Sequence, residues 1–202
     1  MTRQGQPTRI QTLNRSAILE AGLEVFSVQG YRGATLDQIA SEAGLSKPNL
    51  LYYFASKEAI YTALLEGLLD TWLDPLRALG PGGAPLDEIL AYVQRKLIMS
   101  RDYPRESRLF ANEILRGAPQ VEAELHGALK TLVDEKAALI ESWSAAGKIA
   151  KVNAHHLIIS IWALTQHYSD FDVQVRAVLG GDDPFAGAAA HLEQMFIGLL
   201  AV

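Results

Sequence analysis

The sequence predicts an all-α protein in which a small helix-turn-helix head precedes a larger helical bundle. Apolar residues recur with a period near 3.6 along almost every segment, and no segment alternates apolar and polar residues as a half-buried strand does. Candidate caps, glycines and prolines divide this pattern into about nine helices. With 202 residues, of which 49% are hydrophobic, the chain is long enough to bury a full core.

The first helix is expected to begin near Thr12 or Asn14 and to end before Gly30. One of its faces is formed by apolar and small residues at helical spacing, namely Ile18, Ala21, Gly22, Val25 and Phe26. This stripe predicts that the helix packs one face inward and leaves the other in solvent.

Two short helices separated by one tight turn are predicted between residues 35 and 57. Thr35 is a candidate N-cap, and Gln38 three residues later completes the pattern of a capping box. Gly44 supplies the turn because glycine adopts a positive φ at low cost. Ser46 then caps the second short helix. This arrangement is typical of a helix-turn-helix, whose second helix enters the major groove of DNA.

Longer helices are predicted in the rest of the chain. Ser56 caps the first of them, which runs to about Leu79 with a kink expected at Pro75. The segment 80–85, rich in Gly and Pro, is the clearest linker. Further helices are expected at residues 86–101, 104–117, 119–146, 153–178 and 185–202. We therefore place a helix-turn-helix domain at 1–55 and a second domain, for ligand binding and dimerisation, at 56–202.

Composition excludes several classes of protein. The chain has no cysteine, which rules out disulfides, thiolate catalysis and zinc–cysteine sites. It has no run of about 18 apolar residues, so we expect no membrane-spanning helix. No apolar segment follows Arg3, Arg9 and Arg15 as a signal peptide would require. We expect a cytoplasmic protein.

The net charge of −5 is unevenly distributed along the chain. Residues 1–60 sum to +1 and the remainder to −6, and the first acidic residue is Glu20. An acidic body with a basic amino-terminal arm steers DNA toward one end of the molecule. The asymmetry supports DNA binding but is too small to establish it.

On the second short helix, the residues that do not pack inward are the candidates for contact with DNA. Leu50 and Phe54 are its apolar pair and are expected to face the core. Asn49 can contact adenine, and Lys47 can reach a guanine edge or a phosphate. Tyrosine hydroxyls and Lys57 suit phosphate oxygens, which fix the register of the protein on the duplex.

Several short motifs between residues 12 and 61 recur together in a known family. They are Phe26 with Gly30-Tyr31, Ala34-Thr35, Ile39-Ala40, the run from Ala43 to Lys47, Tyr53-Phe54, and Ser56-Lys57-Glu58. In these motifs the chain resembles the TetR family of transcriptional regulators. The resemblance implies a homodimer on a pseudo-palindromic operator of double-stranded DNA, together with a divergent ligand-binding domain.

The chain departs from the family pattern at one informative position. Leu51 stands where the family usually has a tyrosine that contacts DNA, so we expect an apolar contact there, for example with a thymine methyl group. Thr35 lies at a helix N-terminus whose backbone N–H groups suit a phosphate. The expected DNA contacts are Thr35, Ser46, Lys47, Asn49, Leu51, Tyr52, Tyr53 and Lys57.

Segments along nearly the full length match a narrower group within the family. They are residues 49–54, 100–104, 107–110, 117–119, 134–136 and 162–168. These segments are similar to family members that control pyrimidine use. The similarity implies that uracil or thymine is the small-molecule effector that releases DNA, and no cofactor is expected.

A flat ligand with two N–H donors and two carbonyl acceptors requires an aromatic ring to stack on and matched polar partners. Trp162 and Gln166 share one helix face at i and i+4, and Gln166 can both donate and accept. Trp72 and Leu76 are expected to cover the cavity. The candidate effector contacts are Trp72, Leu76, Lys96, Ser100, Arg108, Asn112, Trp162 and Gln166. For each residue taken singly, an ordinary core or solvent-facing role is the alternative.

Two apolar stripes in the last helices are candidates for the dimer interface. One comprises Leu192, Met195, Phe196, Leu199 and Leu200, and the other comprises Ile158, Ile161, Trp162 and Thr165. Two such helices from each subunit bury a four-helix interface, and the alternative is that both stripes belong to the monomer core. His155, His156 and His167 lack the spacing of a metal motif, so we expect no metal.

Alternative functions remain open at this level. One is a regulator of the same type whose effector is a different small aromatic or apolar molecule. Another is a small all-α enzyme acting on a pyrimidine, although the sequence shows no paired acid and base and no nucleophile motif. A third is an interaction module that uses the head for protein contacts, in which the polarity of the short exposed helix is incidental.

Overall fold

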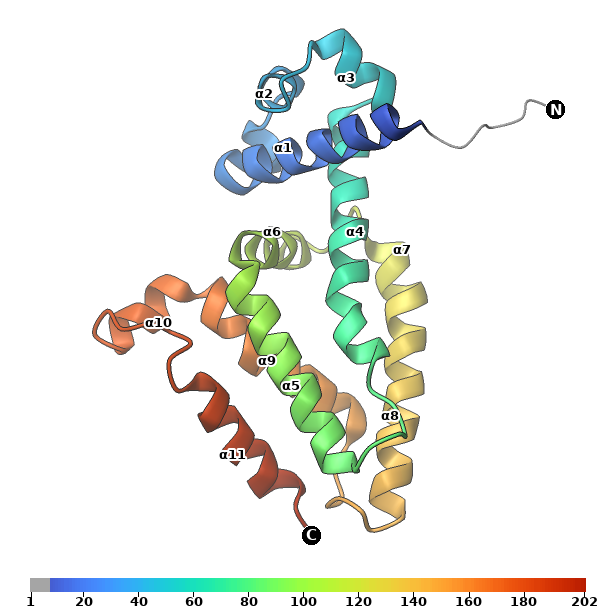
Figure 1. Cartoon of the computed structure of the whole chain (residues 1–202), viewed down its shortest axis with the longest axis vertical. Helices are drawn as coiled ribbons and strands as arrows, with labels where there is room; N and C mark the ends of the chain where they lie inside the picture. Colours follow the sequence, from blue (N-terminus) through green and yellow to red (C-terminus); the bar gives the residue numbers. More distant parts are fainter. Residues whose placement is uncertain (1–7) are drawn as a thin grey trace, which may run out of the picture. The chain divides into compact units, whose positions relative to one another are not determined.

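The computed structural model describes residues 8–202, so Arg3 of the basic arm lies outside the described residues. These residues form α-helices and one π-helical turn, and no strand occurs among them, which confirms the all-α prediction (Figure 1). The chain divides into two compact units, residues 1–68 and 69–202. The boundary falls inside helix α4, Lys57–Arg77.

The first unit begins with α1, Arg9–Gly33, which starts earlier than expected. Thr8 and Gln11 form a capping box there, in which the Thr8 hydroxyl accepts from the Gln11 N–H and the Gln11 side chain accepts from the Thr8 N–H. The sequence signal was the same Thr-x-x-Gln spacing as at Thr35. Gly30 has a φ of 66°, so regular helix breaks at the glycine where the sequence placed its end.

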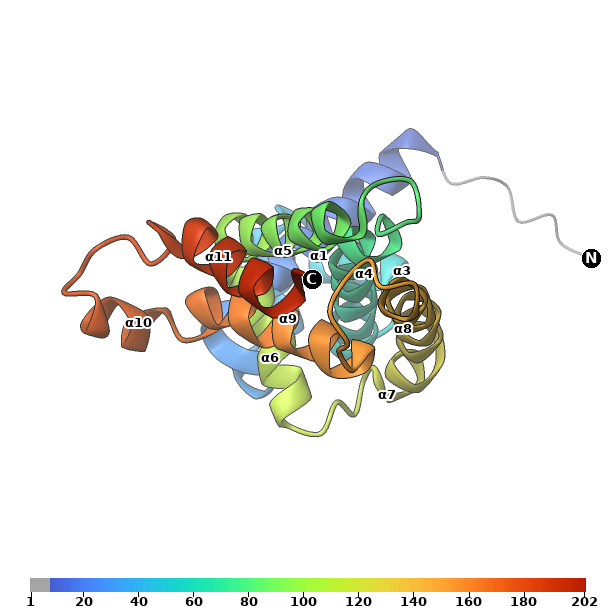
Figure 2. The same cartoon turned by 90° about the horizontal axis from the view of Figure 1, so that it is seen from below.

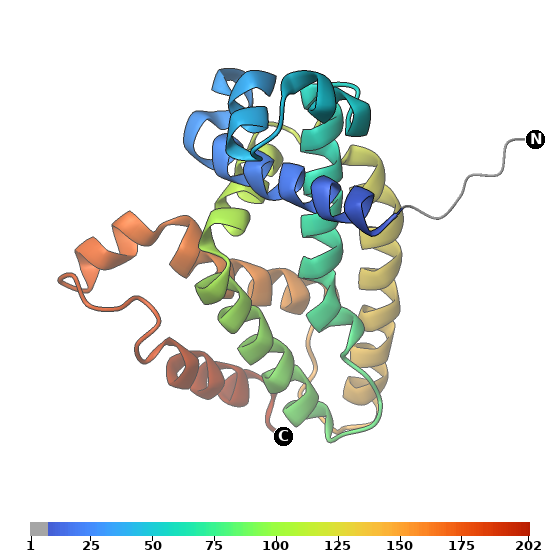
Figure 3. The ribbon, with the colours of Figure 1, turned by 45° about the horizontal axis from the view of Figure 1, so that its top comes forward.

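The helix-turn-helix consists of α2, Leu36–Glu42, and α3, Lys47–Tyr53. The predicted capping box at Thr35 is present, and the Ser46 hydroxyl accepts from the Asn49 N–H. Gly44 takes a φ of 66° in the turn between the two helices, as its position predicts. Figure 3 shows α2 and α3 as two short helices beside α1.

The interior of the first unit is apolar. Buried side chains of α1, α2, α3 and the residue after α3 form it, including Ile18, Phe26, Ile39, Leu50 and Phe54. Leu50 and Phe54 face this core, as predicted. Each fully buried side chain of this size contributes about 1.5–3 kcal/mol, which is enough to fix the orientation of a seven-residue helix that would not be stable alone.

The second unit contains α5 (Pro85–Asp102), α6 (Pro104–Leu115), α7 (Glu122–Glu124), a π-helical turn (Leu125–Leu129), α8 (Lys130–Ala145), α9 (Ala154–Asp170), α10 (Asp172–Val178) and α11 (Ala188–Leu200). Helix α5 packs against both α9 and α11, and α8 packs against α9 (Figures 1 and 2). Ser56 accepts from the Ala59 N–H, as expected for the cap of α4, and Pro75 lies inside that helix.

Three helix boundaries differ from the sequence prediction. The helix expected at 119–146 begins at Glu122, and a π-helical turn separates its first residues from α8. The helix expected at 153–178 is broken at Phe171 into α9 and α10, and the last helix begins at Ala188 instead of residue 185. Apolar periodicity continues across the break at Phe171, which no Gly or Pro marks, whereas the last helix begins directly after Gly187, whose φ is 77°.

The two apolar stripes proposed for dimerisation lie mainly in the core of the second unit, which corrects that assignment. Leu192, Phe196 and Leu200 of α11 are buried, as are Ile158, Ile161 and Thr165 of α9. Met195 and Trp162 are partly buried against the same core, and Leu199 is exposed. The monomer core, the alternative considered above, therefore accounts for most of both stripes.

Two further properties bear on function. Among residues 8–202, no helix is long and apolar enough to cross a lipid bilayer. Within the same residues, no group of three or more His, Asp or Glu side chains is arranged to hold a metal ion.

Candidate DNA-reading surface and effector cavity

Helix α3 exposes a set of polar and apolar side chains on the side opposite its buried residues. Ser46, Lys47, Asn49, Leu51 and Tyr52 are all exposed, and Tyr52 is 69% exposed. Leu50, which is fully buried, anchors the other side of the helix. Five of the predicted DNA contacts therefore lie together on one short helix and its N-cap.

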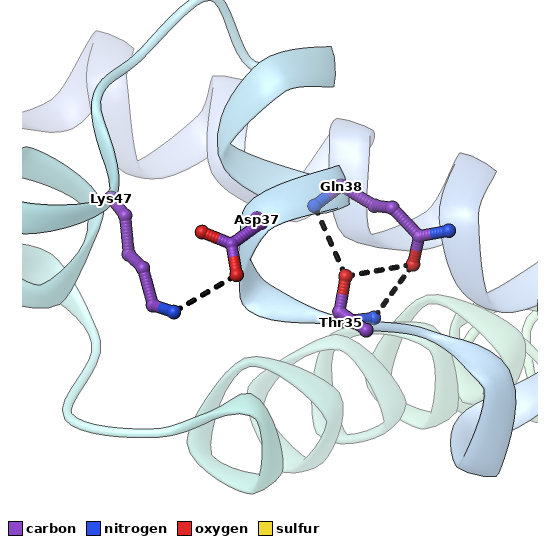
Figure 4. A network of polar contacts seen from close by, with 4 residues as sticks. All are labelled: Thr35, Asp37, Gln38 and Lys47. Carbon is purple, nitrogen blue, oxygen red and sulfur yellow. Dashed lines mark hydrogen bonds and ion pairs between the residues drawn. The ribbon is translucent and has the colours of Figure 1, made fainter.

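Lys47 is held by an ion pair with Asp37 of α2, and this partner was not predicted from the sequence. The Lys47 Nζ lies 2.9 Å from Asp37 Oδ2, and the two side chains are 45% and 70% exposed (Figure 4). A pair so exposed is worth only about 0–1 kcal/mol. Lys47 can therefore exchange this partner for a phosphate or a base at low cost.

The backbone N–H and the hydroxyl of Thr35 both form hydrogen bonds within the capping box of α2. Its N–H and its hydroxyl both donate to Gln38 Oε1 at 2.9 Å, and the hydroxyl accepts from the Gln38 N–H at 3.3 Å (Figure 4). The N–H of Thr35 is thus already paired within the protein. Any phosphate contact at this helix end depends on the next backbone N–H groups, beside the carboxylate of Asp37.

The two tyrosines of α3 are positioned by amides of α1. The hydroxyl of Tyr52 accepts from Gln11 Nε2 at 3.2 Å, and that of Tyr53 accepts from Asn14 Nδ2 at 2.8 Å. A phenol that accepts one bond keeps its own hydrogen to donate, and a phosphate oxygen is a suitable acceptor. Gln11 and Asn14 were missed as positioning residues because they belong to a different helix, far from α3 in sequence.

Lys57 has a role within the protein that the sequence did not reveal. Its Nζ donates to the backbone carbonyls of Tyr31 and Ala34, each at 2.7 Å, and lies 4.6 Å from the centre of the Tyr31 ring. The ammonium therefore satisfies two backbone carbonyls at the C-terminal end of α1, after the break at Gly30. We do not carry Lys57 into the proposed DNA surface.

The second unit contains a cavity of about 610 Å³. Four predicted effector contacts line it, Arg108 and Asn112 from α6 and Trp162 and Gln166 from α9. Its other lining residues include Phe110, Leu125, Leu129, Asp170 and Phe171. An apolar cavity with a few convergent polar groups is the usual form of a small-molecule site.

Trp162 connects the cavity to the buried interior through a hydrogen bond. Its Nε1 donates to the hydroxyl of Tyr92 on α5, at a distance of 2.6 Å. Burial raises the pKa of Tyr92, so the phenol stays neutral. The bond fixes the plane of the indole ring, and Tyr92 was not identified from the sequence.

Asp170, also missed, brings a carboxylate to the cavity wall. Ser107 Oγ donates to Asp170 Oδ1 at 2.5 Å, and Ser169 Oγ lies 3.3 Å from the same oxygen. Burial raises the pKa of Asp170, while these hydroxyls and the charges of Arg108 and Lys96 oppose that rise. The serines were not identifiable because they become neighbours only when α6 packs on α9.

The other four predicted effector contacts do not line this cavity. Leu76 is fully buried in the apolar core, and Ser100 Oγ donates to the backbone carbonyl of Lys96 in its own helix. Lys96 is only 2% exposed, and its Nζ lies 5.4 Å from the centre of the Trp72 ring. Burial lowers the pKa of Lys96 from 10.5 to about 7.

Comparison with known proteins covers both units. Residues 18–64 match the family model described as bacterial regulatory proteins, tetR family, and residues 65–201 match the YcdC-like protein, C-terminal region. The HTH-type transcriptional regulator RutR of Escherichia coli K12 is 53% identical over 176 residues, which are 87% of this chain and 83% of the relative. The same protein of Shigella flexneri matches equally well.

Solved structures share the fold at much lower identity. A TetR-like transcriptional regulator from Rhodococcus sp. RHA1 aligns with a TM-score of 0.69 at 21% identity, over 96% of this chain and 98% of that one. GusR of Salmonella enterica aligns with a TM-score of 0.66 at 20% identity, over the whole of both chains. These structures share the fold, and the two family models together with the 53% identity to RutR show that the chain belongs to the TetR family of transcriptional regulators.

Proposed function

We propose that this regulator is a repressor that binds a pseudo-palindromic operator as a homodimer and is released from it by a small molecule, uracil or thymine. The observation that carries the DNA part is the exposed side of α3, where Lys47, Asn49, Leu51 and Tyr52 surround an anchored Leu50. In this proposal residues 1–55 read DNA, residues 56–202 bind the effector and dimerise, and the protein acts in the cytoplasm, where bacterial operators lie.

Each exposed side chain of α3 has a role that follows from its chemistry. Asn49 pairs with an adenine edge and Lys47 with a guanine edge or a phosphate, whereas Leu51 contacts a thymine methyl group. The hydroxyls of Tyr52 and Tyr53 donate to phosphates and set the register. Two such helices, one from each subunit, reach half-sites about 34 Å apart.

The dimer surface is proposed on the residues that α9 and α11 leave exposed. Ile159 of α9 is 52% exposed and Ile197 of α11 is 39% exposed, and Ala163 and Gly198 beside them are also exposed. Apolar side chains in solvent next to small residues favour close packing against a second copy. This choice replaces the stripes that proved to be core.

The effector proposal rests on the cavity wall formed by α6 and α9. Trp162, held by Tyr92, offers a ring for stacking, and the amides of Gln166 and Asn112 can both donate and accept. A uracil or thymine ring presents both kinds of group. Control of pyrimidine use would follow from such an effector, while a different small aromatic effector is the alternative that binding measurements decide.

Release requires that effector and operator favour different arrangements of the dimer. Because coupling between two binding equilibria is reciprocal, operator DNA must weaken effector binding by the same factor by which effector weakens DNA binding. Helix α4, which carries the boundary between the units, is the continuous element through which the coupling is proposed to pass.

The test begins with duplexes selected from random sequence by the purified protein, followed by titration with uracil and thymine. Binding is measured by fluorescence anisotropy for the wild type, Lys47→Ala and the control Lys148→Ala, which removes the same charge from an exposed site in the second unit. We expect Lys47→Ala alone to weaken DNA binding, and uracil or thymine to dissociate the complex. A protein that selects no duplex at moderate salt would refute the DNA assignment. Dissociation by neither pyrimidine would refute only the effector assignment.

A further inference from the structure

Arg95 of α5 is a half-buried cation, and two of its guanidinium nitrogens make no hydrogen bond to the residues that the structure describes. These nitrogens are Nε and Nη2, and both are buried. A guanidinium carries five N–H donors and no acceptor, and it does not give up its proton in proteins. It therefore stays charged, and buried N–H donors that lack a hydrogen-bond partner are unfavourable.

One polar group close to Arg95 in the fold is the phenol of Tyr92. Tyr92 lies one turn earlier on α5, and the charge of Arg95 opposes the rise in the pKa of the Tyr92 phenol, which places the two groups close together. The Tyr92 oxygen already accepts from Trp162 Nε1, which leaves the phenol hydrogen to donate. The adjacent Lys96 adds a buried amino group, which is also a donor.

The indole nitrogen of Trp72 is a further buried donor without a hydrogen-bond partner among the described residues. The Trp72 ring contacts the ammonium of Lys96, 5.4 Å away. Residues 92, 95 and 96 of α5 therefore bring several hydrogen-bond donors to this part of the second unit.

The effector cavity borders this interior. Trp162 lines the cavity, while its Nε1 touches the hydroxyl of Tyr92 on the α5 side. Asp170, the carboxylate whose charge reaches Lys96, is itself bonded to Ser107 and Ser169. Both hydroxyls bond to the same oxygen, Oδ1, so serines of α6 and α9 position this carboxylate.

We propose that Arg95, together with the Tyr92 hydroxyl, forms a subsite for an anionic oxygen, so that the preferred effector is a planar ring that carries a carboxylate. A carboxylate supplies two acceptor oxygens in the plane that the guanidinium fork matches, and it neutralises the charge. The inference rests on the proposed function in one respect, that the second unit binds an effector beside Trp162. A separate inorganic anion beside a neutral ring has the same chemistry, and the experiment distinguishes the two sources.

The first measurement compares uracil with uracil-6-carboxylate on the full-length wild-type protein by calorimetric titration, in a buffer of weakly binding ions. A charge-assisted pair with a buried guanidinium predicts at least about tenfold tighter binding of the carboxylate. Arg95→Met should abolish that preference and leave uracil binding within about threefold. The control Arg101→Met removes an exposed arginine of the same helix, paired with Asp102, and should preserve the preference.

The second measurement is the thermal midpoint of the protein without effector. Arg95→Met should raise it, because the substitution removes two buried N–H groups that lack hydrogen-bond partners. If the anion comes from solution, inorganic phosphate will raise the midpoint of the wild type but not of Arg95→Met, and it will tighten binding of uracil. If the effector supplies the anion, phosphate will compete with uracil-6-carboxylate instead.

Equal affinity of the wild type for uracil and its carboxylate, with no effect of phosphate on either, overturns the inference without use of any variant. So does a preference for the carboxylate that survives in Arg95→Met. Neither result touches DNA binding, which is measured separately, so failure of this inference is distinguishable from failure of the proposed function.

Discussion

Replacement of Asp37 by Asn is expected to strengthen binding to duplex DNA. Asp37 lies at the start of α2 and pairs with Lys47 at 2.9 Å, on the surface proposed to meet the phosphates. The substitution releases Lys47 from its partner and removes a negative charge that repels DNA. A variant that loses a native ion pair should thus gain affinity.

The magnitude follows from the exposure of the pair. Both side chains are at least 45% exposed, so breaking the pair costs about 0–1 kcal/mol. A carboxylate about 7 Å from a phosphate in water is repelled by about 0.6 kcal/mol. Together these effects amount to about 0.6–1.6 kcal/mol and predict about a three- to fifteenfold gain in affinity at low salt. The weaker helix-dipole interaction should lower the stability by less than about 1 kcal/mol.

Fluorescence anisotropy over a range of salt concentrations measures the effect, because the gain must shrink as salt screens the charges. Glu42→Gln is the matched control, since it removes the same charge from the other end of α2. Unchanged or weaker binding by Asp37→Asn, or an equal gain in Glu42→Gln, would refute the electrostatic reasoning. Unchanged or weaker binding by Asp37→Asn would indicate that Asp37 positions Lys47 or accepts a hydrogen bond from a base.

Four further outcomes are expected. Leu50→Ala should lower the free energy of unfolding by about 2–5 kcal/mol, measured by denaturant titration, because Leu50 is fully buried beneath α3; an effect below 1 kcal/mol would contradict the proposed anchoring. Ile159→Asp should yield a folded monomer in analytical ultracentrifugation, and a persistent dimer would exclude the proposed surface on α9. Burial lowers the pKa of Lys96 to about 7, so the unfolded state binds more protons than the native state between that pH and 10.5. Wild-type stability should therefore rise with pH across this window by at most about 1.4 kcal/mol per unit, and Lys96→Met should remove the slope and stabilise the protein at pH 6. Trp162→Phe keeps the ring but loses the bond to Tyr92, so it should weaken effector binding measured by calorimetry while operator affinity in anisotropy assays stays the same.

The head was predictable because its signals are local. The capping box at Thr35, the positive φ of Gly44 and the cap at Ser46 each involve residues within a few positions of one another. The same logic failed at Thr8 only because its capping box was overlooked. Helix breaks such as the one at Phe171 were not predictable, since apolar periodicity continues through them and packing decides the change of direction.

The candidate effector site was predicted only in part. A helix period identifies which face is buried but not what covers it, so the stripes of α9 and α11 could not be assigned to core or interface. Trp162 and Gln166 were found because they share a helix face, and Asp170 continues the same i, i+4 series on α9, so the same spacing could have predicted it. Tyr92 joins them from α5 only through packing. Lys57 shows the same limit, because its carbonyl partners lie 23 and 26 residues away.

The amino-acid order alone determined the all-α class, the reading helix and its anchored side, because caps, turns and periodicity act over one or two helical turns. The tertiary structure decided which polar groups meet in the interior, namely Tyr92 with Trp162 and Ser107 with Asp170. These contacts join residues far apart in sequence, and their energies depend on a burial that exists only once the helices have packed together.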